Sequence, residues 1–350
     1  MQRGYSTRGI RFLAVAFSIG LITAVANYQV AAADVFTDPV GFITLTANGT
    51  TLGGVGALSY LGLGMTQIPT NRGVISTISG TKITTSSVLP NNGFASGASG
   101  PLYFIEFLDG AHPGLLDDIV SNDTASVFTG TNDATAVSGA TMYKIYPHWT
   151  VATVFGPNDE SGLMGGGAIG SADNILIPLQ SSQTFAKYYW FNGKGTVGWK
   201  DGSGNLVGNV RIFPDQGILI SKATTTNLTI KLIGAVKLGP TLIPVGGTNT
   251  FLGNVYATSA MTLTNSKLYT GNAATGLTGG GSVGAADNVL IHQDGGTYAK
   301  YYWFNGKGTV GWKDISGNDA SNVAISNGVS VLISLQTGHN GFNWAAAALY

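Results

Sequence analysis

The sequence contains no cysteine in its 350 residues, and only 10% of them are charged. The absence of cysteine excludes disulfides, thiol catalysis, cysteine-ligated zinc and iron–sulfur clusters. An ordinary globular protein has about 25% charged residues. Nucleic-acid binding needs clustered Lys and Arg to displace counterions. The few basic residues here are spread thinly, so we do not expect a nucleic-acid partner.

After residue 34 there is no apolar run long enough for a transmembrane helix, so none is expected in the mature chain. The N-terminus differs, because three arginines precede an apolar run over 12–26 and small residues follow at 31–33. This run is shorter than the ~20 residues of a membrane anchor. We therefore predict that residues 1–33 are a signal peptide, with Ala26 as an alternative cleavage point. The expected location is extracellular or on the cell surface. Cleavage removes three of 17 basic residues and no acidic one, which leaves a net charge near −3.

Short β-type runs are the main secondary-structure signal. Hydrophobic residues make up 44% of the chain, which is enough for a core. Runs rich in Val, Ile, Thr, Tyr and Phe alternate with Gly, Asn, Asp and Ser clusters about every ten residues. Examples are 73–87, 102–110, 140–147 and 227–234. We predict a mostly β fold, with an N-terminal small barrel or sandwich followed by two paralogous antiparallel β-modules.

A sixteen-residue string, AKYYWFNGKGTVGWKD, occurs twice, at 186–201 and 299–314. The likeness continues upstream, where 162–177 resembles 276–291. A duplication of this kind indicates repeated architecture.

We divide the mature chain into a β-barrel or sandwich domain (35–147), a first β-module (148–238) and a second β-module (239–350). A fainter echo links SYLGLG (59–64) to TFLGNV (250–255). It indicates that the N-terminal unit is itself an older copy into which residues 73–147 have been inserted.

The repeated string predicts a β-hairpin. Asn192-Gly193 is the usual signal for a two-residue type I′ turn, which would place Trp190 opposite Gly195. One face of this hairpin, including Trp190 and Trp199, is expected in the core. The other face is predicted to be exposed and to form a ligand or partner surface in both copies, comprising Lys187, Tyr189, Phe191, Lys194, Lys200, Lys300, Tyr302, Phe304, Lys307 and Lys313.

Two explanations remain open for the unchanged polar face. One is a recent duplication, although the flanking segments 202–216 and 315–328 have diverged. Alternatively, the face performs the same task twice, by contacting a neighbouring subunit or by binding a ligand. Aromatic rings beside lysines would suit sugar stacking or a protein contact.

Catalytic motifs are matched only superficially. Residues 165–170 and 279–284 fit G-x-G-x-x-G, and 280–284 also fits G-x-S-x-G. Both motifs require a following helix, which the sequence does not indicate, so we interpret them as tight turns. Glu106 is interpreted as an ordinary strand residue and Asp117-Asp118 as a solvated turn. The four histidines show no ligand spacing, and we predict no enzyme activity and no cofactor.

Calcium is the one metal for which the sequence offers candidates. The possible ligands lie in two polar turns and are Asp201, Asn205, Asp314, Asn318 and Asp319. Each turn supplies two or three oxygens, whereas calcium takes six to eight. We favour the alternative that these residues form Asx-type turns between strands.

Several strings resemble one group of proteins: TDPVGFITL (37–45), YFIEFLDG (103–110), GLLDDI (114–119) with SND (121–123), and IYPHWTVATVFG (145–156). The group is an uncharacterised family of signal-peptide-bearing, β-rich exported bacterial proteins. The resemblance implies export and a β architecture, and it carries no catalytic residues.

The resulting hypothesis is an exported, non-enzymatic structural protein of the cell surface or extracellular space that self-associates into a layer, sheath or filament. The alternative is an adhesin or polysaccharide-binding protein that uses the repeated aromatic hairpin face.

Overall fold

The computed structural model describes residues 38–50, 58–131, 136–179, 182–254, 256–257, 261–293 and 297–346, and residues 38–350 form one compact unit. The fold is mostly β, as the sequence predicted. None of the helices in these ranges is long and apolar enough to cross a membrane. The predicted signal peptide, residues 1–33, lies outside the described residues.

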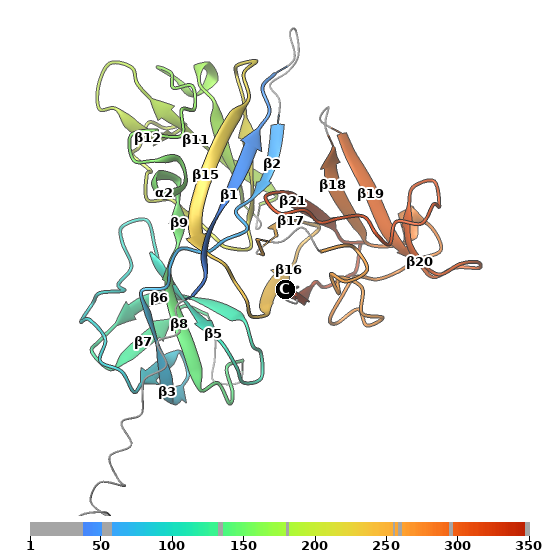
Figure 1. Cartoon of the computed structure of the whole chain (residues 1–350), viewed down its shortest axis with the longest axis horizontal. Coiled ribbons are helices and arrows are strands. Elements are labelled where there is room, and N and C mark those ends of the chain that lie inside the picture. Colours follow the sequence, from blue (N-terminus) through green and yellow to red (C-terminus); the bar gives the residue numbers. More distant parts are fainter. Residues whose placement is uncertain are drawn as a thin grey trace, which may run out of the picture. The chain divides into compact units, whose positions relative to one another are not determined.

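Six strands close into a barrel in the order β3-β4-β7-β6-β5-β8, so of the two predicted forms, barrel or sandwich, the chain has the barrel (Figure 1). Ile105 and Phe107 of β5 point into the barrel, and Phe104 and Glu106 of the same strand are buried on its other face. Burial on both faces explains why this strand is apolar almost throughout. The strands are β3 (Asn71–Ser79), β4 (Lys82–Thr85), β5 (Tyr103–Phe107), β6 (Leu115–Asn122), β7 (Ser126–Thr129) and β8 (Met142–Pro147).

The first module contains a five-stranded sheet in the order β12-β11-β10-β14-β2 and a two-stranded ribbon, β1–β15. The ribbon packs its apolar side onto the sheet. The strands are β1 (Val40–Ala47), β2 (Leu58–Gly62), β10 (Asn174–Leu179), β11 (Thr184–Phe191), β12 (Gly198–Asp201), β14 (Gly217–Ser221) and β15 (Leu228–Ala235). Two short strands, β9 (Trp149–Thr150) and β13 (Arg211–Ile212), pair with each other.

The second module repeats this plan. Its sheet has the order β20-β19-β18-β21-β17, and its ribbon is β16–β22. The strands are β16 (Thr241–Val245), β17 (Asn249–Gly253), β18 (Asn288–Gln293), β19 (Thr297–Phe304), β20 (Gly311–Asp314), β21 (Ser330–Ser334) and β22 (Phe342–Ala346). Read from the hairpin outward, each strand of one sheet has a counterpart in the other, so β2 corresponds to β17 and β14 to β21.

The strand pairing differs from the sequence-based division at the N-terminus. That division places residues 35–66 with the barrel, whereas β1 pairs with β15 and β2 with β14. The barrel therefore occupies the connection between β2 and β9 of the first module. The echo between 59–64 and 250–255 falls on β2 and β17, the two corresponding edge strands. Each of these strands ends in a glycine, Gly62 in β2 and Gly253 in β17, because the two strand ends meet where the modules join.

The two modules meet through reciprocal contacts. Gly62 N donates a hydrogen bond to Gly328 O at 3.1 Å, and Gly253 N donates to Asp215 O at 2.8 Å. A Cβ on Gly62 would lie 2.9 Å from the Cα of Gly253, closer than real Cβ atoms approach. Glycine at the ends of β2 and β17 therefore allows the two backbones to cross. The contact is isologous in form, because each module offers the same strand end to the other.

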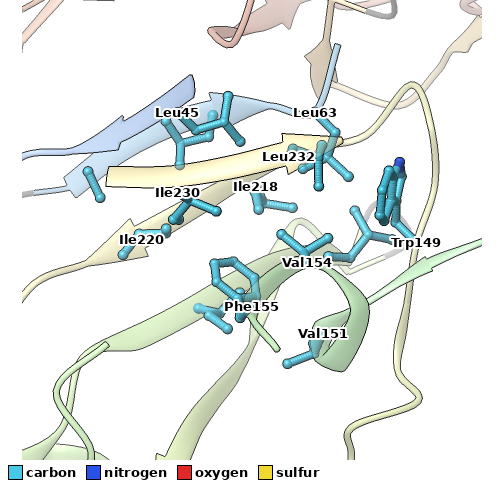
Figure 2. Packing of buried hydrophobic residues seen from close by; sticks show 14 of the residues in the cluster. Leu45, Leu63, Trp149, Val151, Val154, Phe155, Ile218, Ile220, Ile230 and Leu232 are labelled. Atoms are coloured by element: carbon cyan, nitrogen blue, oxygen red, sulfur yellow. The ribbon is translucent and has the colours of Figure 1, made fainter. Parts of the chain in front are cut away.

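The core of the first module lies between its ribbon and its sheet (Figure 2). Leu45 and Leu232 of the ribbon face Ile218 and Ile220 of β14, and α2 (Val151–Phe155) adds Phe155. Thr150 begins this short helix with a reciprocal capping box, and Gly156 ends it with a φ of 89°. The 3₁₀ turns η1 (Ile169–Ser171) and η2 (Val283–Ala285) precede β10 and β18.

Candidate functional site

The repeated hairpin forms in both modules, but its turn is longer than predicted. Phe191 pairs with Gly198 and Trp190 with Trp199, so residues 192–197 form the loop. Positive φ occurs at Gly195 and Gly198, not at Asn192 and Gly193. The prediction of a two-residue type I′ turn was therefore wrong. The second module has the same register, with Trp303 opposite Trp312.

The assignment of the tryptophan face to the core survives this correction. Trp199 and Trp312 are 2% and 1% exposed, and their cross-strand partners Trp190 and Trp303 are half-buried against the same cores. The indole rings meet edge to face, with centroids 5.3 Å apart in the first module and 5.8 Å in the second. Trp199 Nε1 donates to Gly156 O at 2.7 Å, so its polar atom is satisfied inside the core.

The glycine-rich loops support the hairpins. Gly166 N donates to Trp190 O and Asn192 N donates to Gly166 O, which extends the sheet beside β11. A Cβ on Gly165 would lie 2.7 Å from Trp190 Cδ1, so the indole needs glycine beneath it. Gly279 stands in the same position under Trp303, at 2.8 Å. The 3₁₀ turns that follow these glycines are three residues long, unlike the helix of a dinucleotide site. The glycines thus make room for the indoles, a packing role that the tight-turn interpretation did not include.

The predicted partner surface is only partly accessible. Tyr189 and Tyr302 are 6% and 7% exposed, so the prediction that their rings lie on the surface was wrong. Tyr189 lies beside Phe191, with ring centroids 6.4 Å apart, and opposite Lys200, whose Nζ is 3.7 Å from the Phe191 ring centroid. The neighbours on the same face therefore cover Tyr189.

The remaining members of the predicted surface divide into two groups. Four lysines, two within the strands and two in the loops, are exposed, namely Lys187, Lys194, Lys300 and Lys307. Two lysines and two phenylalanines are half-buried, namely Lys200, Lys313, Phe191 and Phe304. The exposed members of the predicted surface are thus lysines, with no tyrosine among them.

The candidate calcium ligands sit in two matching turns. Asp201 Oδ1 accepts hydrogen bonds from Ser203 N and Asn205 N, both at 2.9 Å, and its Oδ2 accepts from the Asn205 side chain at 2.9 Å. Asp314 has the same bonds with Ser316 and Asn318. The Asn205 amide, followed by backbone donors, lowers the pKa of Asp201. The geometry is that of an Asx turn. Among the described residues, no three His, Cys, Asp or Glu side chains gather as a metal site.

Asp319, the fifth candidate ligand, accepts a hydrogen bond from Ser321 Oγ at 2.8 Å. Its backbone forms an isolated bridge with Lys313, so it closes the turn after β20.

Buried ion pairs are the polar feature that the sequence did not reveal. Lys237 pairs with Glu106, and Lys222 pairs with Asp173, with all four side chains at most 5% exposed. Asp117 and Asp118 lie in β6 and not in a solvated turn, and Asp118 accepts from His148 Nε2 at 2.8 Å. Partners far apart in sequence give no local pattern, which is why these pairs were missed.

Two of the histidines lie beside carboxylates. Burial lowers the pKa of His148, which favours the neutral ring beside Asp118 and Arg211. His339 Nδ1 lies 2.6 Å from Asp287 Oδ2, and its Nε2 lies 2.8 Å from Ala273 O. A carboxylate and a carbonyl both accept hydrogen bonds, so each nitrogen of the His339 ring faces an acceptor.

An open pocket and a filled one occupy corresponding places in the two modules. His292 of β18 lies opposite Tyr298 of β19, and Tyr60 of β2 lies opposite Leu219 of β14. The centroid of the Tyr60 ring is 4.4 Å from that of His292 and 5.1 Å from that of Tyr298. Burial, with a hydrogen bond to Tyr60, raises the pKa of Tyr298. Three rings therefore fill this position.

In the corresponding position, Pro178 lies opposite Phe185 and Leu332 opposite Phe251. A pocket of about 210 Å³ opens here, lined by Pro178, Leu179, Gln183, Thr184, Phe185, Asn249, Phe251 and Leu332.

Comparison with known proteins identifies no relative. The chain matches no family model, no curated protein and no solved structure.

Proposed function

We propose that the protein is an exported, non-enzymatic structural protein of the cell surface or extracellular space that self-associates. The observation that carries the proposal is an apolar pair on the outer face of the β1–β15 ribbon. Phe42 and Ile233 lie directly opposite each other and are 70% and 67% exposed. Val40, on the same face, is 56% exposed. Exposed apolar side chains that gather on one face are typical of a protein contact.

The outer face of the second module's ribbon meets the barrel. Leu242, which lies opposite Ala345 on that face, is half-buried. Leu242 N donates to Gly114 O of the barrel at 3.1 Å. The barrel thus contacts the ribbon of the second module, whereas Phe42 and Ile233 are open to solvent. This contrast supports a second molecule as the group that covers them.

The test compares two variants of the purified protein by sedimentation velocity and electron microscopy at rising concentration. We expect wild type to form dimers or larger assemblies, and Phe42→Ser with Ile233→Ser to shift the protein to monomer. Ile315→Ser is the matched control, because Ile315 is 68% exposed but lies in the turn after β20. Wild type that stays monomeric would contradict the proposal. An intact mass beginning at Asp34 would support export.

The polysaccharide alternative loses part of its original basis, because Tyr189 and Tyr302 are buried. The pocket at Phe185 and Phe251 gives binding a different location.

A further inference from the structure

The open pocket beside Phe251 is the counterpart of a place that the protein fills with a ring of its own. Tyr60 corresponds to Phe251, Tyr298 to Phe185 and His292 to Pro178, as the strand registers show. In the filled position, the His292 imidazole lies against the Tyr60 ring, with centroids 4.4 Å apart. Proline is shorter and gives no planar ring for stacking. We infer that the pocket accepts a single ring from outside the molecule, and we propose that this ring is a neutral hexopyranose.

The size of the pocket agrees with one ring. Its volume is about 210 Å³, below the roughly 300–1,000 Å³ of pockets that hold drug-sized ligands. A single sugar unit, at the end of a glycan or within it, is therefore the scale of ligand to expect.

The walls favour the apolar face of a sugar. Phe185 and Phe251 meet at 66° with centroids 5.2 Å apart, so the pocket has two aromatic sides. An aromatic face is electron-rich and attracts the weakly positive hydrogens of C–H groups. A hexopyranose whose hydroxyls are all equatorial presents such hydrogens on an unbroken face. An axial hydroxyl would interrupt that face.

The rim favours a neutral ligand with several hydroxyls. Gln183, Thr184 and Asn249 supply amide and hydroxyl groups, and none of the lining residues is charged. The rim is held in place across the two modules, because Gln183 Nε2 donates to Asn249 O at 3.1 Å and Asn249 N donates to Gln183 Oε1 at 3.0 Å. The described lining residues therefore offer no cation to an anionic sugar. A phenylalanine side chain of a partner could not hydrogen-bond with the rim.

The experiment is saturation-transfer-difference NMR on the full protein with methyl β-glucopyranoside, methyl α-mannopyranoside, glucuronate and N-acetylphenylalanine amide as probes. We expect transfer to the glucoside, concentrated on its ring hydrogens, and weaker transfer to the mannoside and glucuronate. Because a lone ring makes few contacts, the affinity should be weak, with a Kd of roughly millimolar. Stronger transfer to the phenylalanine amide would overturn the sugar assignment in favour of a peptide partner.

Two exchanges between the modules make the decisive variants. Pro178→His puts a histidine into the pocket, as His292 fills the corresponding position beside Tyr60. This substitution should lower glucoside affinity at least tenfold. His292→Pro should open a second pocket and increase the number of bound glucosides. If His292→Pro fails to fold, Phe251→Leu removes one aromatic wall and should also weaken binding. Binding that is unchanged in both Pro178→His and Phe251→Leu would overturn the proposal. Sedimentation of the same variants should be unaltered, which separates this site from self-association.

Discussion

The two modules share one strand order and differ in what surrounds it. In the first, the connection after β2 contains a six-stranded barrel, and in the second the chain from β17 to β18 contains no named strand among its described residues. The strands of both sheets keep their register despite this difference. A connection at the end of an edge strand can therefore accept a whole domain, because none of the barrel strands contributes to the core between ribbon and sheet.

The reciprocal glycine contacts between the modules also bear on assembly. An isologous contact closes on itself and leaves no copy of the same surface for a further unit. The duplication is therefore complete within one chain and does not by itself lead to a polymer. Self-association needs another surface, and the outer face of the β1–β15 ribbon is the apolar one that the first module leaves open.

The sharpest difference between the modules is the side chain that pairs with the buried aspartate. Asp173 accepts from Met164 N and Ala223 N and pairs with Lys222, while Asp287 accepts from Thr278 N and Gln336 N and pairs with His339. The backbone donors are equivalent, so the two sites differ in the side chain, lysine or histidine, that contacts the carboxylate. That makes the comparison suitable for mutation.

The largest expected effect follows from removing the lysine. Lys222→Met leaves the Asp173 charge buried without its cation, and breaking a buried pair in this way costs about 3–5 kcal/mol of the free energy of unfolding. Chemical denaturation measures it. His339→Gln should cost less, because glutamine can still donate to Asp287.

The double variant Asp173→Asn with Lys222→Met is the control, since it removes the charge together with its partner. We expect it to recover most of the loss. A double variant as unstable as Lys222→Met alone would mean that shape, and not charge, determines the cost.

A second asymmetry lies at the junction, where Asp215 corresponds to Gly328. Burial, with a contribution from Asp118, raises the pKa of Asp215 from 3.8 to about 6. The folded protein thus holds this proton more tightly than the unfolded chain. The resulting penalty grows as the pH rises from 3.8 to about 6 and is complete above that. Asp215→Asn should therefore stabilise the protein at pH 7 by up to roughly 3 kcal/mol.

Denaturation at two pH values tests this prediction. The gain should be present at pH 7 and vanish near pH 4, where aspartate is protonated in the folded protein. An equal gain at both values would point to altered packing instead of charge.

The sequence was sufficient for the broad architecture, and the hairpin shows why finer geometry was not. The predicted and observed pairings of β11 with β12 differ by four residues, an even number, and side chains alternate with a period of two. Trp190 and Trp199 therefore stay on the core face although the turn was wrong. Asn192-Gly193 was misleading because the glycines at positive φ are further along, at 195 and 198.

The burial of Tyr189 could not be predicted in the same way. Alternation assigns a residue to a face but says nothing of what covers that face. Here the cover comes from Phe191 and from Lys200, whose amphipathic chain lies over the ring next to the tyrosine. The pocket at Pro178 depended on the packing of two modules against each other. The exchange of His292 for Pro178 was visible in the sequence, but its consequence required the register of four strands.

The smallest effects should be the most alike in the two modules, because the turns at Asp201 and Asp314 share the same hydrogen bonds. Asp201→Ala and Asp314→Ala should each lower the thermal unfolding midpoint slightly and equally. Calcium should not change the midpoint of wild type relative to EDTA, since the donors of each turn already bind the carboxylate. If calcium raised the midpoint and the two substitutions together abolished the rise, the turns would be metal sites. A rise lost with only one substitution would show that the modules have diverged there too.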